Sequence, residues 1–234
     1  MLTFVTRLAG ALLALAGLAL TVVGAWFAVQ LGSSGTAEFT ARPGTTDPVL
    51  IRPDVLNRVD ADVVVRATPG EGGSAWMALA NPSDATAVLG TARHLDVTGV
   101  SVRDWLLLTA ARGTGAPAEL GAADLWRQQD QADGPVTLTV QQDQAPETLV
   151  VATDGAPLKT LTVTVTDKTW FVEAVIAALV GLFLFFAGLI LLFSRRRRRA
   201  RPAGHPDPDP DSHPVTDADP TTPHSTPDHE EVTR

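Results

Sequence analysis

The sequence predicts a mainly β domain, an antiparallel β-sandwich with one short helix, attached to a transmembrane hairpin of two helices and followed by a disordered tail. Three observations support this fold class. Long apolar runs occupy residues 8–31 and 170–193. Between them, 34–168 contains short stretches in which apolar and polar residues alternate, as in half-buried strands. Residues 195–234 are dense in Pro, Asp, Thr and His, too polar to form a core.

The two apolar runs are long enough to cross a membrane. Each holds about 24 residues, roughly 36 Å as a helix, against a hydrocarbon layer of ~30 Å. Glu173 is the single charge within the second run. A cleaved signal peptide is the alternative for the first run, because Arg7 precedes it and small residues follow it. Its apolar stretch exceeds the ~7–15 residues of such signals, so we expect an uncleaved helix.

Basic residues beside the runs predict the orientation of the chain. The second run ends at five consecutive arginines: Arg195, Arg196, Arg197, Arg198 and Arg199. Arginine and lysine beside a spanning helix stay in the cytoplasm, and the same side is indicated for Arg7. We therefore expect a multi-pass plasma-membrane protein with a cytoplasmic N-terminus (1–7), a cytoplasmic tail (195–234) and an extracytoplasmic domain (34–168). The arginine cluster is also suited to contact anionic lipid headgroups.

Small residues recur along one face of each apolar run. In the first run they alternate at spacings of four and three: Gly10, Ala14, Gly17, Thr21, Gly24 and Ala28. In the second run they are Ala174, Ala178, Gly181 and Gly188. Small residues let helix backbones approach closely in lipid, and this spacing is typical of a left-handed crossing near about +20°. We expect the two helices to pack against each other, with homodimer packing or a merely compositional bias as alternatives.

Strand signals fill the segment between the runs. The clearest are 135–140 and 161–166, which alternate with period two and are rich in β-branched residues, and 61–67 is similar. Weaker candidates are 75–80, 100–103, 105–109 and 147–152. Turn signals separate them, among them Pro69-Gly70, Asp133-Gly134 and Asp154-Gly155. Many short strands with such turns predict an antiparallel sandwich.

Both ends of this domain enter the same membrane from the same side. The first strand, near 37–42, should run away from the bilayer and the last, 161–166, should run back. We therefore expect these two strands to lie close together, antiparallel and paired. The two spanning helices must then be neighbours.

One short helix is predicted inside the domain. Asn81 can cap it, Pro82 suits its first position, and Gly90 would end it. A second candidate, 118–131, has helical residues around Trp126 but a poor apolar stripe, and its structure is left open.

The chemistry of the outward segment does not indicate an enzyme. The chain has no cysteine, and His94 is the only histidine in 34–168. Ser74, Ser83 or Ser101 with His94 and Asp96 would supply the residue types of a Ser-His-Asp triad. However, no nucleophile motif surrounds His94, so we expect a surface histidine. Nucleotide-binding, zinc-protease, esterase and EF-hand motifs are also missing from the sequence, and we expect neither metal nor cofactor.

The remaining aromatic and charged residues bear on binding. Trp76, Trp105 and Trp126 would either line a ligand groove or belong to the core, and we expect core positions. Acidic residues outnumber basic ones in 34–168, which argues against a nucleic-acid partner. The expected partners are the lipid bilayer and an unknown membrane or envelope protein.

These observations predict a non-catalytic binding or scaffolding role in the cell envelope. One alternative is a membrane sensor that reports to a cytoplasmic partner through its tail. A surface hydrolase is a remote alternative.

Three stretches, 76–100, 124–140 and 147–157, resemble a family of uncharacterised actinobacterial membrane proteins. They are similar to the short helix, the Trp strand with its following turn, and the Asp-Gly turn of that family. This chain has Gln142-Asp143-Gln144 where the family has a second Trp-containing strand. The resemblance implies an extracytoplasmic β domain and a C-terminal transmembrane helix with a basic stop. It implies no catalytic or ligand-binding residue.

Overall fold

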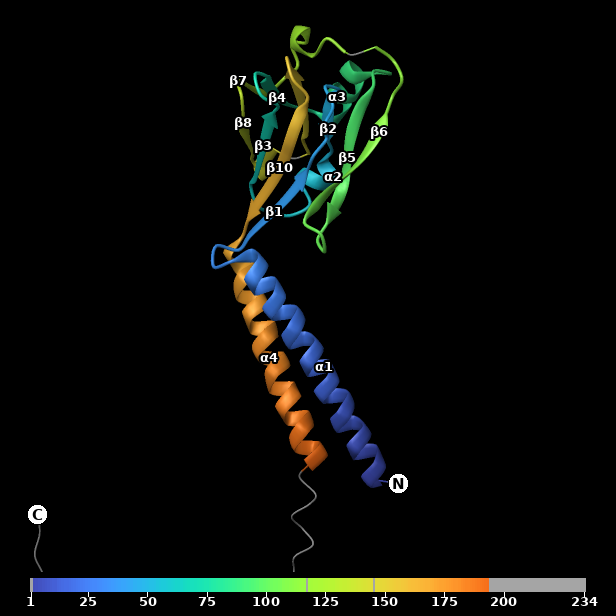
Figure 1. Ribbon diagram of the computed structural model, residues 1–234, viewed down its shortest axis with the longest axis vertical. Helices are drawn as coiled ribbons and strands as arrows, with labels where there is room; N and C mark the ends of the chain where they lie inside the picture. The colour runs from blue at the N-terminus through green and yellow to red at the C-terminus, as the bar shows by residue number, and fades with distance from the viewer. Residues whose placement is uncertain (1, 117, 145, 194–234) are drawn as a thin grey trace, which may run out of the picture. The chain divides into compact units, whose positions relative to one another are not determined.

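The computed structural model describes residues 2–116, 118–144 and 146–193 (Figure 1). Within them, the helices are α1 (Leu2–Leu31), α2 (Pro53–Leu56), α3 (Pro82–Leu89) and α4 (Lys168–Phe193), with 3₁₀ turns η1 (Leu120–Ala122) and η2 (Gln142–Gln144). The strands are β1 (Thr36–Ala41), β2 (Val49–Ile51), β3 (Val63–Pro69), β4 (Ser74–Ala80), β5 (His94–Ser101), β6 (Leu106–Arg112), β7 (Gln128–Asp133), β8 (Val136–Val140), β9 (Thr148–Asp154) and β10 (Leu158–Thr166). The predicted disordered tail and its cluster Arg195–Arg199 lie outside the described residues.

All ten strands belong to one mixed sheet, in the order β7-β4-β9-β2-β5-β6-β1-β10-β3-β8. The edge strands β7 and β8 are consecutive in the chain, and β8 also contacts β4, so the sheet bends back toward itself. The predicted mainly β domain is confirmed, but the expected wholly antiparallel pairing is wrong. β2 pairs with β5, and β1 with β6, in parallel. Parallel neighbours need long crossover connections, and the segments between these strands supply them.

The first and last strands pair, as predicted. β1 and β10 are antiparallel, in a register from Thr36 opposite Thr166 to Ala41 opposite Leu161. The backbone N–H of Asp167 then donates to the carbonyl of Gly35 at 3.0 Å. A Cβ at Gly35 would lie 2.0 Å from the Asp167 carbonyl oxygen, and Gly35 has a φ of +66°. Both the space and the backbone conformation therefore require glycine at this crossing.

Two hydrophobic clusters stabilise the sheet. The larger fills its concave side and includes Val65, Met77, Leu149 and Leu161. The smaller lies on the outer face of β2, β4 and β9, under α3 and the η1 segment. Strand β9 is consequently buried on both faces from Thr148 to Val151. Burial on both faces removes the alternation that identifies a strand in sequence.

The predicted short helix is confirmed as α3, which begins at Pro82 and is followed by Gly90. The side chain of Asn81 donates to Asp84 Oδ2 at 3.0 Å and makes no cap hydrogen bond to the helix backbone. The open segment 118–131 contains η1 and the first part of the edge strand β7, with no α-helix among its described residues.

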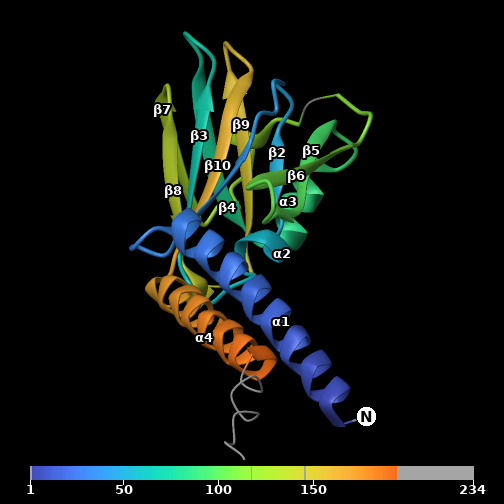
Figure 2. The same ribbon diagram turned by 60° about the horizontal axis from the view of Figure 1, so that its bottom comes forward.

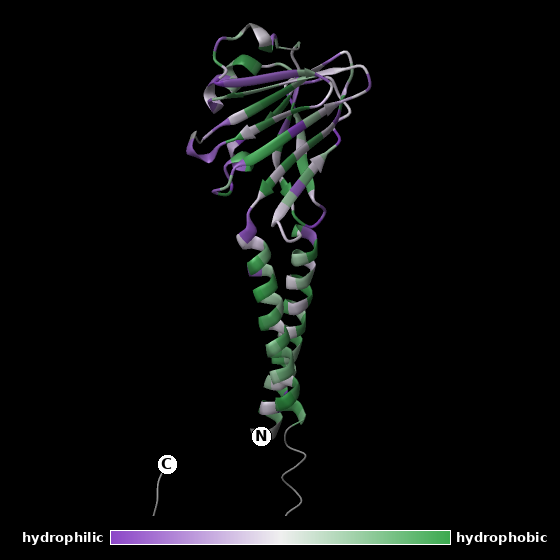
Figure 3. Ribbon diagram, turned by 90° about the vertical axis from the view of Figure 1, so that its left-hand side faces the viewer, coloured by the Kyte–Doolittle hydropathy of each residue, from purple (hydrophilic) through white to green (hydrophobic). Residues whose placement is uncertain are grey.

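Helices α1 and α4 lie side by side in Figures 1 and 2. By length and composition, Phe4–Leu31 and Lys168–Phe193 are apolar enough to cross a membrane. Figure 3 shows apolar residues along both helices, in contrast to the mixed colours of the β domain. Their outward side chains are large and exposed, including Leu15, Val29, Phe183 and Ile190.

Candidate apolar binding site

The helix pair is held by contacts between glycine backbones. A Cβ on Gly17 would lie 2.4 Å from the backbone nitrogen of Phe185, and one on Gly24 would lie 2.6 Å from that of Ala178. A Cβ on Gly188 would lie 2.5 Å from the nitrogen of Ala14. Real side chains do not approach this closely, so the two backbones touch where these glycines lie.

The small residues that the sequence singled out are placed along this seam. Contacts across it involve Gly10, Ala14, Gly17, Thr21 and Gly24 from α1 and Ala174, Ala178, Gly181 and Gly188 from α4. The hydroxyl of Thr21 donates to the carbonyl of Gly17 at 2.8 Å, which satisfies it within its own helix. Ala28 lies one turn beyond Gly24 and is half-buried.

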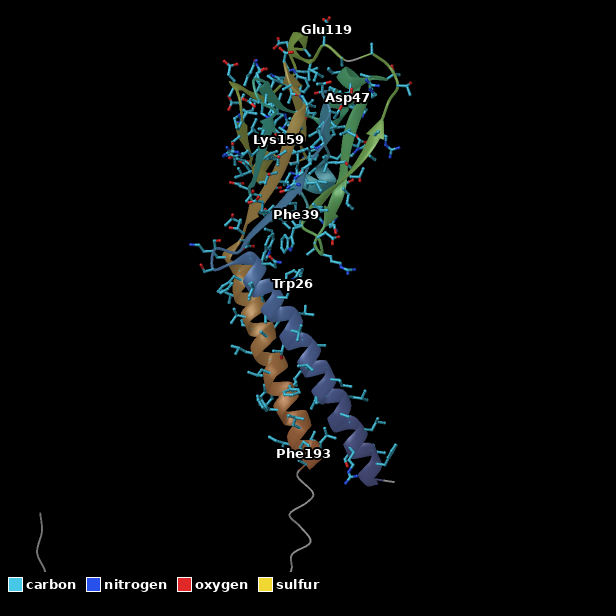
Figure 4. The ribbon with its side chains drawn as sticks, viewed as in Figure 1. Trp26, Phe39, Asp47, Glu119, Lys159 and Phe193 are labelled. Atoms are coloured by element: carbon cyan, nitrogen blue, oxygen red, sulfur yellow. The ribbon has the colours of Figure 1, made fainter. Side chains whose placement is uncertain are left out.

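Where the seam ends, a pocket opens between α1, α4 and the adjoining end of the β domain. Its volume is about 540 Å³, within the ~300–1,000 Å³ usual for ligand pockets. Its walls come from α1, β1, the segment after α2, the β5–β6 turn, β10 and α4. Figure 4 labels Trp26 and Phe39, which lie at this junction. Apart from two charged side chains, the lining is almost wholly apolar.

Trp105 forms the aromatic wall of the pocket. Its ring stacks on Phe39 with centroids 5.3 Å apart and lies 6.2 Å from the ring of Trp26. Among the described residues, Trp105 is the single non-glycine with a positive φ, at 56°. The Trp105 carbonyl accepts a hydrogen bond from Thr40 N at 3.1 Å, which holds this strained backbone in place. Its indole nitrogen is buried with no hydrogen-bond partner in the described structure.

Arg58 and Glu173 are the two ionisable side chains in the lining. Both are exposed, and neither makes a hydrogen bond or ion pair with the described residues. Glu173 is the only charge within the second apolar run of the sequence. A carboxylate is costly near the centre of a bilayer, so one inside an apolar run is a candidate functional position. The isolated position of Glu173 in the apolar run is visible in the sequence. Its place in one pocket with Arg58 and Trp105 is visible only in the structure.

The predicted surface position of His94 is wrong. His94 is 8% exposed, with Nε2 3.3 Å from Oδ1 of the fully buried Asp96 and Nδ1 2.8 Å from the Ala92 carbonyl. Asp96 Oδ2 also accepts from Arg52 at 2.5 Å and faces Arg112 at 3.7 Å. His94 is buried because residues 94 and 96 share one face of β5 and the arginines come from neighbouring segments.

The serines considered for a triad are placed elsewhere. Ser83 donates to Asp84 and Ser101 donates to Asp104, while Ser74 lies at the start of β4. Within the described residues, no serine hydroxyl is hydrogen-bonded to His94. His94 and Asp96 thus belong to a polar cluster with Arg52 and Arg112 that ties β5 to its neighbours.

Sequence reasoning missed a second buried carboxylate, Glu147. Its side chain is 1% exposed and lies 3.1 Å from Arg127, while its backbone N–H donates to Asn57. Burial raises the pKa of Glu147, an effect that the charge of Arg127 partly opposes. Asn57 also donates to Gln142, so this cluster joins α2 to the segment before β9.

Trp76 and Trp126 pack together on the outer hydrophobic cluster, with ring centroids 5.2 Å apart. All three tryptophans are half-buried and pack against a hydrophobic cluster, Trp76 and Trp126 against the smaller one and Trp105 against the larger one. Trp105 also lines the pocket. Comparisons of the chain with protein-family models, curated proteins and solved structures found no match. The resemblance to actinobacterial membrane proteins therefore stays a prediction.

Proposed function

We propose that this chain is a two-pass membrane protein that presents a non-catalytic, ligand-binding or scaffolding β domain on the outer side of the plasma membrane. The observation that carries the proposal is the pair of long apolar helices, packed through glycine and continuous with the paired strands β1 and β10. In water their exposed apolar side chains would be unfavourably hydrated, whereas lipid accommodates them.

The short connections between the two helices and the β domain support the proposal that the domain is held at a fixed height above the membrane. Only residues 32–35 separate α1 from β1, and Asp167 alone separates β10 from α4. Gly35 and Asp167 are joined by a backbone hydrogen bond, and Leu31 and Trp170 pack against the domain core. A short, packed connection of this kind transmits the position of the helices to the β domain without a flexible linker.

The binding role is supported by the pocket at this junction. It is apolar and aromatic, and it is formed jointly by the helices and the β domain. The buried charged clusters, by contrast, are paired internally, as expected for groups that stabilise the fold.

Cysteine accessibility tests the proposed orientation, because the chain has no native cysteine. Glu119→Cys places a thiol on an exposed residue of the β domain, and Ser212→Cys places one in the tail. A membrane-impermeant maleimide should label the first in intact cells and the second only after permeabilisation. Labelling of Ser212→Cys in intact cells, or failure to label Glu119→Cys there, would contradict the proposed topology.

A further inference from the structure

We infer that the pocket between α1, α4 and the β domain binds a bilayer phospholipid, with an acyl chain inside and an amine-bearing phosphate headgroup between Arg58 and Glu173. This inference rests on the proposed two-pass arrangement. It adds a ligand class and a binding site to that arrangement.

The volume of the pocket favours a flexible apolar chain over a helical protein segment. An α-helix with its side chains is ~10–12 Å across and advances ~5.4 Å per turn, so about 540 Å³ holds little more than one turn. A single turn offers a partner helix few contacts. A flexible hydrocarbon chain can instead fill the space between Phe39, Trp105 and Val163.

The pocket is continuous with the surface that would face lipid. Leu20 and Val23 line the pocket, yet they are 36% and 51% exposed on the outside of α1. A chain already lying along α1 can therefore bend into the pocket from the side without crossing water. Trp170 also lines the pocket, and tryptophan favours the level of the headgroups.

Charge complementarity identifies the headgroup. Arg58 offers a guanidinium, which pairs well with a phosphate oxygen, and Glu173 offers a carboxylate, which pairs with a primary ammonium group. Both side chains lack partners among the described residues, so both remain available. A phosphoethanolamine headgroup carries one phosphate and one ammonium and matches this pair, whereas a phosphoglycerol headgroup lacks the amine.

Photolabelling of the full chain in bilayer nanodiscs tests this inference. The probe is phosphatidylethanolamine with a diazirine at the end of one acyl chain, compared with the same chain on phosphatidylglycerol. In the wild type, the ethanolamine lipid should label peptides containing 55–59 and 100–105, which belong to the β domain. A chain end that stays in the bilayer would label α1 and α4 only, and that result would overturn the inference.

One matched pair of variants separates the pocket from the rest of the surface. Ala177→Phe fills the pocket, whereas Ala25→Phe adds the same ring to an exposed position outside it. Labelling of the β domain should fall about tenfold in Ala177→Phe, equivalent to ~1.4 kcal/mol, and stay unchanged in Ala25→Phe. Equal labelling in both variants would overturn the inference.

Headgroup recognition is tested with substitutions of the exposed residues Arg58 and Glu173, which do not disturb the hydrophobic core. Arg58→Gln should lower labelling by both lipids about threefold, as for loss of one exposed ion pair, while Arg42→Gln serves as the control. Glu173→Gln should abolish the preference for the ethanolamine lipid over the glycerol lipid. No preference in the wild type would refute the headgroup assignment. Cysteine accessibility reports independently on topology, so failure of lipid binding is distinguishable from failure of the proposed function.

Discussion

At the scale of single residues, buried charge is the feature with the clearest consequences. Asp96 is fully buried, yet His94, Arg52 and Arg112 surround it within 4 Å. Glu147 is equally buried but has one cationic neighbour, Arg127. In each carboxylate one oxygen, Asp96 Oδ1 and Glu147 Oε2, has no hydrogen-bond partner in the described structure. The two buried carboxylates therefore differ in the number of basic side chains beside them, three for Asp96 and one for Glu147.

The pH dependence of stability should report on Glu147. Because burial raises its pKa from the ordinary value of 4.5, the folded protein binds a proton at this site more tightly than the unfolded chain does. The free energy of unfolding contributed by Glu147 should therefore fall as the pH rises from 4.5 through the raised pKa. Denaturant unfolding in detergent, at a series of pH values, measures this change.

Glu147→Gln cannot ionise and should lack this component. The stability difference, wild type minus Glu147→Gln, should decrease with increasing pH over that range. Glu119→Gln, on an exposed residue, is the control and should show no such trend. A difference that stays constant with pH would contradict the proposed environment of Glu147.

At the scale of elements, the α1–α4 seam depends on the lack of side chains. Gly17 lies against the backbone of Gly181 and Phe185, so a larger residue there must separate the helices. Without water to drive apolar association in lipid, close backbone contact is the main attraction between two such helices.

Gly17→Leu should destabilise the helix pair by about 2 kcal/mol or more, since overpacking typically costs ~1–3 kcal/mol and rigid backbone is the obstacle here. Ala16→Leu is the matched control, because Ala16 is exposed on the same turn of α1. Thermal unfolding in detergent provides the measurement. Equal melting temperatures for the two variants would show that the seam is not a tight contact in solution.

At the scale of the whole molecule, the β1–β10 pairing closes the chain. Thr36 and Thr166 are directly opposite in the register, and their hydroxyl oxygens are 3.3 Å apart. Directly opposed strand residues have Cα atoms ~4.5–5.5 Å apart, a separation that suits a disulfide.

The double variant Thr36→Cys, Thr166→Cys should form a disulfide on oxidation, because its thiols replace two facing hydroxyls. Thr36→Cys with Thr162→Cys is the control, since Thr162 pairs with Thr40 and lies further along the strand. Cleavage at an introduced protease site in the 113–119 connection, followed by non-reducing electrophoresis, measures the cross-link. Fragments that stay together in the control, or separate in the first variant, would contradict the register.

The order of apolar, polar, proline and glycine residues within a short segment explains which strands and helices could be predicted from the sequence. Strands β8 and β10 alternate because one face of each is buried, and α3 carries a proline at its start and a glycine after its end. Strand β2 has three buried residues and no alternation, so it was missed. Strand β7 is an exposed polar edge strand, whose sequence lacks an apolar stripe of either period.

The sequence by itself determined the two apolar helices, the stripes of small residues along them and the mainly β character of the segment between them. These features depend on composition and short-range periodicity, which act within one element. Tertiary structure alone decided the mixed sheet order, the burial of His94 beside Asp96, and the meeting of Arg58, Trp105 and Glu173 around one pocket. Those residues come from segments far apart in the chain, and only long-range strand pairing and helix packing set the distances between them.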